Sequence, residues 1–227
     1  MAQSVDGSPA TEAGRKPAAA RVVRHALPDR IFHWLTAASV LILLGTAFLP
    51  ILGLEFAWVN IHWITGLVLT AAVLFHIVRA AFWQSWRAIW IGAADLRDAA
   101  AIVRSTLGGR GAPAPPKPGK YSFAQKLIHH AFAVVVLTTV VTGLLMLLRI
   151  DTPWWQRNPY VLANATWGII YVLHGLGALA LITMVMVHIY FALRPEKLLF
   201  TRSMISGWIT REEYGEHHDP KRWQVDR

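Results

Sequence analysis

Four long stretches of this chain contain no charged side chain, and each is long enough to cross a lipid bilayer as a helix, which takes about 20 apolar residues. They run from Ile31 to Leu54, Phe56 to Val78, Leu127 to Leu148 and Asn158 to Leu193. The last exceeds what a bilayer requires, so we expect its helix to begin near Trp167, after a turn that contains Pro159. Helices satisfy their own backbone hydrogen bonds in lipid, and the pattern therefore predicts an all-α membrane protein.

This pattern divides the chain into three parts. Residues 1–28 are expected to form a disordered basic arm, because the first twenty positions are rich in Ala, Gly, Ser and Pro. Residues 29–200 are predicted to form a four-helix membrane bundle, and residues 201–227 a tail. The helices are expected at about 31–52, 58–82, 126–148 and 167–193.

Composition agrees with a membrane protein and narrows its chemistry. Hydrophobic residues make up 55% of the chain and charged residues only 15%. There is no cysteine. Disulfide scaffolds, thiolate zinc sites, cysteine-ligated iron–sulfur clusters and covalently attached haem are therefore excluded. The ten histidines remain as the strong metal ligands.

The positive charges predict the orientation in the membrane. Twenty of the 22 Lys and Arg residues lie in the two termini and the loop between the second and third helices. Cytoplasmic segments carry such an excess, so we expect both termini in the cytoplasm. The net charge of +9 is thereby explained by basic segments on the cytoplasmic side of a membrane, without nucleic acid as a partner.

Histidines recur at matching depths on two of the predicted helices. His174 and His188 are 14 residues apart, which places them on one face and separates them by about 21 Å along a helix. His62 and His76 repeat this spacing on the second helix. Ionisable residues at membrane depth are costly and suggest function. The pattern indicates two metal centres stacked across the membrane.

Haem iron fits this pattern better than zinc, because zinc sites cluster three or four ligands around one ion. A haem needs axial ligands and a slot between helices, which small residues provide. Glycines stand near the histidines at Gly45, Gly66, Gly143, Gly175 and Gly177. Two histidine ligands per haem leave no open position for a substrate, so the expected chemistry is electron transfer. At the inner level His33, His76 and His188 compete for two axial positions, and spacing does not choose among them.

The order and spacing of several motifs resemble the membrane cytochrome b (gamma) subunits of respiratory formate dehydrogenases. The likeness extends from about Asp29 to Trp223. Its motifs are residues 29–34 (DRIFHW), Ile61-His62 with Gly66, Gly119-Lys120-Tyr121 with Gln125-Lys126, residues 141–143 (VTG), Leu173-His174, residues 187–190 (VHIY), and a tail with Gly207, His217-His218, Pro220 and Trp223.

The resemblance implies two b haems and assigns their ligands. By this likeness His62 and His174 bind the outer haem, and His33 and His188 bind the inner one. His76 stays as the alternative to His33. The resemblance also implies a site for menaquinone or ubiquinone near the inner haem, at Ser122, Ala124 and Gln125, with Lys120 and Tyr121 alongside. The family has Asn where Ser122 stands, so the hydrogen bonding to a quinone differs here.

The resemblance implies that electrons arrive from a periplasmic iron–sulfur (beta) subunit and reduce a quinone near the cytoplasmic side. Formate itself would be oxidised by a molybdenum or tungsten catalytic (alpha) subunit, since this chain has no soluble domain for such a cofactor. Alternatives are the cytochrome b of a nickel–iron hydrogenase or another periplasmic oxidoreductase, a transporter, and a haem-free membrane anchor.

The remaining polar residues near the cytoplasmic side have simpler interpretations. Arg30, Arg79 and Arg194 could pair with haem propionates or with lipid phosphates. His129 and His130 are expected at the membrane interface, with a proton relay as the alternative. His217 and His218 lie in a charged tail and are expected to be solvated or to contact a partner.

Overall fold

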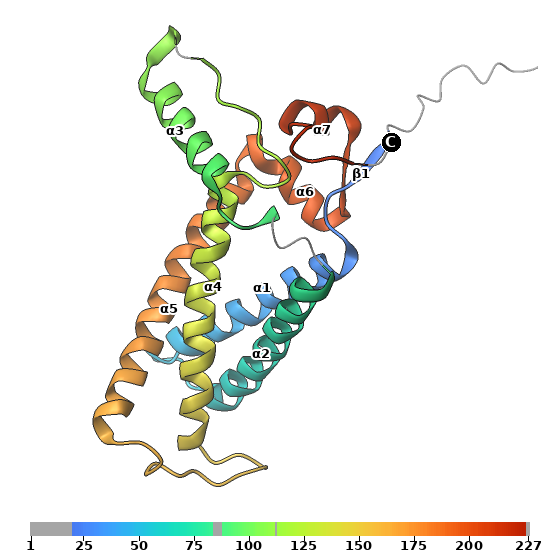
Figure 1. The fold of residues 1–227 in the computed structure, drawn as a ribbon. Helices are drawn as coiled ribbons and strands as arrows, with labels where there is room; N and C mark the ends of the chain where they lie inside the picture. Colours follow the sequence, from blue (N-terminus) through green and yellow to red (C-terminus); the bar gives the residue numbers. More distant parts are fainter. Residues whose placement is uncertain (1–19, 84–87, 112, 226–227) are drawn as a thin grey trace, which may run out of the picture.

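A computed structural model describes residues 20–83, 88–111 and 113–225 (Figure 1). Four long helices have the length and hydropathy to cross a membrane. They are α1 (Leu27–Phe48), α2 (Trp58–Trp83), α4 (Phe123–Met146) and α5 (Asn164–Leu193). Short 3-10 helices occur at Gly109–Gly111, Leu147–Arg149 and Pro195–Lys197. Most of the expected N-terminal arm, residues 1–19, lies outside the described residues.

Three of these helices begin earlier than the sequence predicts, α4 among them at Phe123. Helix α1 begins at Leu27, with Pro28 at its start and Asp29 in its first turn. Proline is tolerated in the first turn and a carboxylate there is favourable to the helix dipole, so these residues join the helix although they are not apolar. Helix α5 begins at Asn164, three residues before Trp167.

The four long helices form two antiparallel hairpins, α1 with α2 and α4 with α5 (Figure 1). Their shared apolar core takes Val40 and Leu44 from α1, Leu69 from α2, Val136 from α4 and Leu181 from α5. Most other side chains of these helices remain at least partly exposed, as expected where lipid is the solvent.

A small folded unit lies at the end of the bundle that carries both termini. Strand β1 (Arg21–Val23) pairs antiparallel with β2 (Trp208–Thr210), so that Val22 lies opposite Ile209. Helices α6 (Leu198–Ser206) and α7 (Arg211–His217) flank β2. The end of the expected disordered arm is thus ordered, because Val22 is buried against Ile209 and Tyr214. We call this unit, with residues 118–122 and 218–223 packed on it, the tail unit.

The tail unit corrects one expectation from the sequence. His218 is only 1% exposed, not solvated. Its Nδ1 donates to the carbonyl of Gly119 at 2.7 Å, so its Nε2 is the acceptor for Arg24 Nη1 at 2.6 Å. Burial, together with the nearby positive charge of Arg24, lowers the pKa of His218 to about 4. His217 is partly exposed, as expected.

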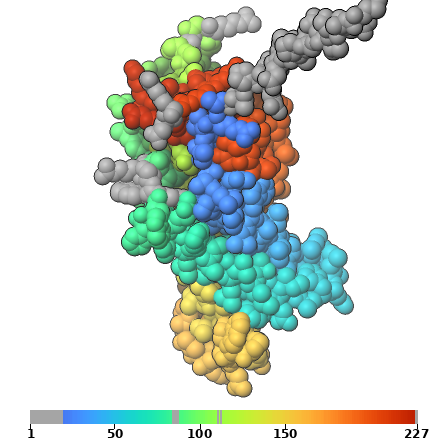
Figure 2. Space-filling view, turned by 90° about the vertical axis from the view of Figure 1, so that its right-hand side faces the viewer, coloured from blue at the N-terminus to red at the C-terminus, as the bar shows by residue number. Residues whose placement is uncertain are grey.

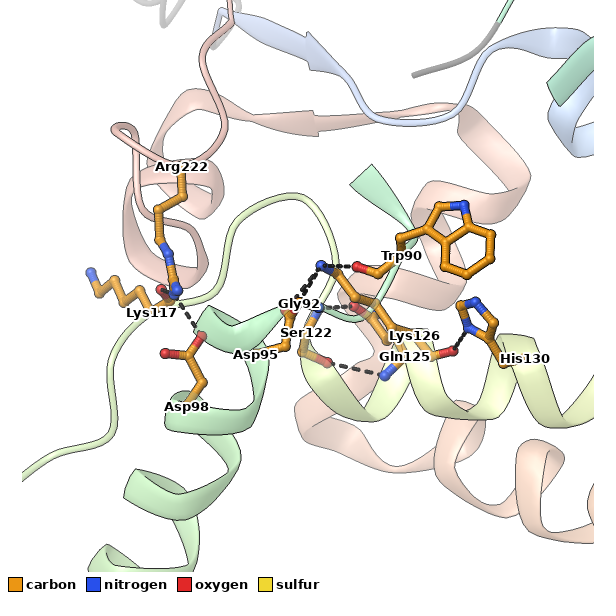
Figure 3. Close-up of polar contacts among 10 residues, drawn as sticks. All are labelled: Trp90, Gly92, Asp95, Asp98, Lys117, Ser122, Gln125, Lys126, His130 and Arg222. Atoms are coloured by element: carbon orange, nitrogen blue, oxygen red, sulfur yellow. Dashed lines mark hydrogen bonds and ion pairs between the residues drawn. The ribbon is translucent and has the colours of Figure 1, made fainter. Parts of the chain in front are cut away.

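The space-filling view shows the tail unit at one end of the molecule and the connection between α4 and α5 at the other (Figure 2). Helix α3 (Ala93–Leu107) leads away from the bundle beside α4 (Figure 1). Its base is held by Asp95, which pairs with Lys126 at 2.9 Å, and by Asp98, which pairs with Arg222 at 2.7 Å (Figure 3).

Candidate metal centres

The histidines expected at the outer level face each other between the two hairpins. The ring centroids of His62 on α2 and His174 on α5 are 6.2 Å apart, with the planes 65° from each other. A metal–imidazole bond of about 2.0 Å, plus roughly 1.1 Å from nitrogen to ring centre, places the centroids about 6.2 Å apart when both rings bind one ion from opposite sides. The spacing therefore fits two axial ligands of one metal.

Two threonines fix the orientation of this pair. Thr46 Oγ1 lies 2.8 Å from His62 Nδ1, and Thr142 Oγ1 lies 2.9 Å from His174 Nδ1. Each hydroxyl also donates to a backbone carbonyl of its own helix, so it accepts from the imidazole N–H. The other ring nitrogen, Nε2, is then left unprotonated as the metal ligand. The sequence argument gave neither threonine a role, although Thr142 lies in the motif at residues 141–143.

The inner histidines form a second pair with the same spacing. The ring centroids of His33 on α1 and His188 on α5 are 6.3 Å apart, with planes at 50°. Phe132 of α4 packs edge-on against His188 at 5.9 Å. The Nδ1 atom of His33 is buried and has no hydrogen-bond partner. The inner pair thus shares the spacing of the outer pair but lacks its threonine contacts among the described residues.

His76 does not lie opposite His188. Its ring stacks on Phe32 at 4.2 Å and lies 6.3 Å from the ring of His129. His129 in turn is 5.5 Å from His130, whose Nδ1 donates to the carbonyl of Lys126 at 2.8 Å. The structure therefore brings His33, rather than His76, to the inner partner on α5.

The glycines near the histidines leave room for a flat group. A Cβ added to Gly66, one turn after His62, would meet no atom within 4 Å, and the same holds for Gly175 beside His174. A Cβ on Gly143 would come within 3.2 Å of the His174 ring. A haem with two histidine ligands fits three of these features: the facing imidazoles, the tautomer that the threonines set in His62 and His174, and the open space at two glycines.

The residues expected at the quinone site begin helix α4. The Ser122 N–H donates to Gln125 Oε1 at 2.9 Å, and the Gln125 N–H donates to Ser122 Oγ at 3.3 Å, which is a reciprocal capping box (Figure 3). These bonds use acceptor atoms and leave the side-chain amide N–H groups of Gln125 available as donors. Ala124 offers only its backbone to a polar ligand.

The arginines proposed for haem propionates divide into two groups. Arg79 pairs with Asp29 at 2.9 Å, and Arg194 pairs with Glu196 at 2.9 Å. Both charges are therefore already neutralised. Arg30 donates instead to the carbonyl of Ile205, and its Nε is buried without a partner.

Comparison with known proteins finds a family model and relatives that match most of this chain. The family model of prokaryotic cytochrome b561 matches residues 24–207. The chain is 26% identical over 217 residues to a formate dehydrogenase cytochrome b556 subunit of Haemophilus influenzae, covering 89% of this chain and 82% of that protein. It is also 26% identical over 216 residues to the formate dehydrogenase cytochrome b556(fdo) subunit of Escherichia coli K12, covering 89% and 91%.

Proposed function

Since the chain belongs to the prokaryotic cytochrome b561 family, we propose that it is the di-haem cytochrome b subunit of a membrane-bound respiratory formate dehydrogenase. The observation that carries this proposal is the pair of facing histidine couples, with ring centroids 6.2 and 6.3 Å apart. The two relatives, both named as formate dehydrogenase cytochrome subunits, support the choice of complex.

The histidine couples would hold one haem b at each level of the membrane. His62 and His174 would bind the outer haem, and His33 and His188 the inner one. Each bound haem iron supplies a one-electron carrier. With two histidines holding each haem, no coordination position would remain for oxygen or substrate, so these residues favour electron transfer over catalysis at the metal.

The orientation expected from the positive charges supports an electron path from the periplasmic face to the cytoplasmic face. The tail unit and the basic segments would face the cytoplasm of the bacterial inner membrane. At the opposite end the loop between α1 and α2 exposes Ile51 and Leu52, at 76% and 75%, and the connection between α4 and α5 exposes Trp154 at 69%. Exposed apolar and aromatic side chains of this kind suit a partner surface, here the iron–sulfur subunit, which would in turn dock the molybdenum or tungsten subunit.

The quinone would bind beside the first turn of α4, near the inner haem. Gln125 is held by the capping box and can donate its side-chain N–H to a quinone oxygen. Lys120 and Tyr121 precede it and add further donors. Such donors stabilise negative charge on a quinone oxygen as it is reduced, and protons would be taken from the cytoplasmic side.

The test is a haem and electron count on the purified complex. Pyridine haemochrome assay should give about two haems b per copy of this chain, and formate should reduce both before a quinone analogue reoxidises them. A haem-free chain would refute the cytochrome proposal. Haems that are reduced by hydrogen and not by formate would instead assign the chain to a hydrogenase.

A further inference from the structure

The buried polar side-chain atoms without a partner gather in one short segment. Among the described residues they are Arg24 Nε, Arg30 Nε, His33 Nδ1 and Thr36 Oγ1. The last three lie in the first turns of α1, which carry the inner histidine. Buried polar atoms are nearly always paired in folded proteins, so a cluster of unpaired ones points to a ligand that binds to these residues.

Arg24 is the most unusual member of this cluster. Its side chain is 2% exposed, yet its partners are neutral: Nη1 contacts His218 at 2.6 Å and Nη2 donates to the carbonyl of Lys120 at 3.1 Å. The guanidinium lies 4.7 Å from the ring centre of Phe200. Burial lowers its pKa to about 10. A buried guanidinium without an anion is costly, since buried charges are normally paired.

Lys120 adds a second cation beside Arg24. Its pKa is lowered by burial and by the charge of Arg24, against an opposing effect of Asp29. The ammonium group lies 5.4 Å from the ring centre of Tyr121 and forms no ion pair with any described residue. The carboxylate of Asp29 is bound by Arg79 at 2.9 Å. The cluster therefore carries an excess of positive charge.

His25 connects this cluster to the inner histidine pair. Its pKa is lowered to about 3, first by burial and then by the charges of Arg24 and Lys120, with a smaller contribution from His33. His25 is thus near both the cations and the inner ligand. Arg30 lies on α1 one turn before His33.

We propose that Arg24 and Lys120, together with Arg30, form the binding site for the propionate carboxylates of the inner haem. This inference rests on the proposed function and gives Arg24 and Lys120 a role toward the haem that neither the histidine pattern nor the family motifs gave them. Two carboxylates would supply the missing negative charge and accept from the unpaired guanidinium nitrogens. The tail unit would then help to hold the cofactor, because Arg24 contacts His218 and donates to the carbonyl of Lys120.

A redox titration of the purified complex tests the site through Lys120→Gln. Removing a cation near the haem disfavours the added electron, so the midpoint potential of the inner haem should fall while that of the outer haem stays constant. In the titration the inner haem is identified as the one whose signal disappears in the His188→Ala variant. Lys117→Gln is the matched control, because Lys117 is an exposed lysine of the same segment that bonds the carbonyl of Gly215, and it should move neither potential.

Arg24 is tested in the same way, with its charge kept or removed. Arg24→Gln should lower the inner potential and shift the propionate bending band in the resonance Raman spectrum, and Arg24→Lys should reverse most of the potential change. If Arg24→Gln disturbs the tail unit, the comparison of Lys120→Gln with Lys117→Gln still decides whether the cations bind the propionates.

An anionic lipid phosphate at these cations is the rival outcome. Lys120→Gln would then weaken binding of anionic phospholipid, measured by native mass spectrometry from nanodiscs, and leave both potentials unchanged. Unchanged inner potentials in Lys120→Gln and Arg24→Gln would overturn the propionate site. A chain with fewer than two haems would instead refute the proposed function.

Discussion

The outer and inner histidine pairs share one spacing but differ in what surrounds them. At the outer level both imidazoles are oriented by threonine hydroxyls, Thr46 for His62 and Thr142 for His174. At the inner level His33 has an unpaired Nδ1, and cationic side chains of the tail unit lie nearby. Both sites therefore consist of two facing histidines, but the contacts that support the histidines differ between the sites.

This difference predicts a direction for electron flow. A hydroxyl that accepts from the imidazole N–H strengthens the histidine as a donor to the metal and stabilises the oxidised iron. Cations near the inner pair stabilise the reduced form. Both effects make the outer haem the weaker electron acceptor, so electrons should pass from the outer level to the inner level.

Removing a ligand should have the largest effect and should act on one level only. His174→Ala should abolish the outer haem and leave the inner one, because α5 supplies one ligand to each pair. His188→Ala should do the reverse, and His76→Ala should retain both haems. Absorption spectra of reduced membranes measure this. Loss of the inner haem in His76→Ala, with retention in His33→Ala, would reverse the assignment of the inner ligand.

Acidification should destabilise the tail unit, which lies at the end of the bundle near the inner pair, before it affects the opposite end. The pKa of His218 is about 4 in the folded protein, below its ordinary value of 6.5. His218 in the undocked tail therefore binds a proton at a higher pH than His218 in the docked tail. The free energy that keeps the tail unit docked falls by at most about 3 kcal/mol as the pH drops from 6.5 toward 4. His25, with its pKa near 3, acts in the same direction.

Hydrogen exchange of β2 and α7, corrected for intrinsic rates, should rise between pH 7 and pH 5, with α4 and α5 unchanged. His218→Gln should reduce this pH dependence, and His217→Gln should not. Equal acid sensitivity at both ends of the bundle would contradict the comparison.

Removing a threonine hydroxyl should weaken the outer haem selectively. Thr142→Val keeps the shape of the side chain but removes the acceptor for His174 Nδ1. Contacts of this kind contribute about 10- to 100-fold to metal affinity, so haem retention at the outer level should fall by roughly that factor. Thr138→Val is the control, since the Thr138 hydroxyl donates to the carbonyl of Val134 and contacts no histidine among the described residues. A similar loss in both variants, measured by haem transfer to an acceptor protein, would show that Thr142 has no specific role.

The smallest effect is expected from Gln125→Glu, which separates helix capping from quinone binding. Glutamate keeps the acceptor of the capping box, so thermal stability should be preserved. It removes the side-chain N–H donors, and KM for quinone should rise about tenfold, the equivalent of one hydrogen bond. An unchanged KM would leave Gln125 with a capping role alone.

The sequence was most informative where lipid and histidine spacing impose strong constraints. Four uncharged stretches correctly predicted four apolar helices long enough to cross a membrane, because a charge is costly in a bilayer. The 14-residue spacing placed His174 and His188 on one face of a helix, and in the structure each of them faces a histidine of another helix. The spacing could not choose between His33 and His76, since that depends on how the hairpins pack.

The tail unit was beyond the sequence argument because its contacts join distant segments. Val22 pairs with Ile209, and Arg24 meets His218 across 194 positions of the chain. Neither segment has an apolar period long enough to predict its partner. The burial of His218 and the charge cluster at Arg24 therefore emerge only from the folded arrangement.

The most direct measurement of the central claim is low-temperature electron paramagnetic resonance of the oxidised complex. Two histidine couples predict two low-spin ferric haem signals that integrate to two spins per chain, one lost in His174→Ala and the other in His188→Ala. High-spin iron, or a single signal removed by both variants, would contradict the account.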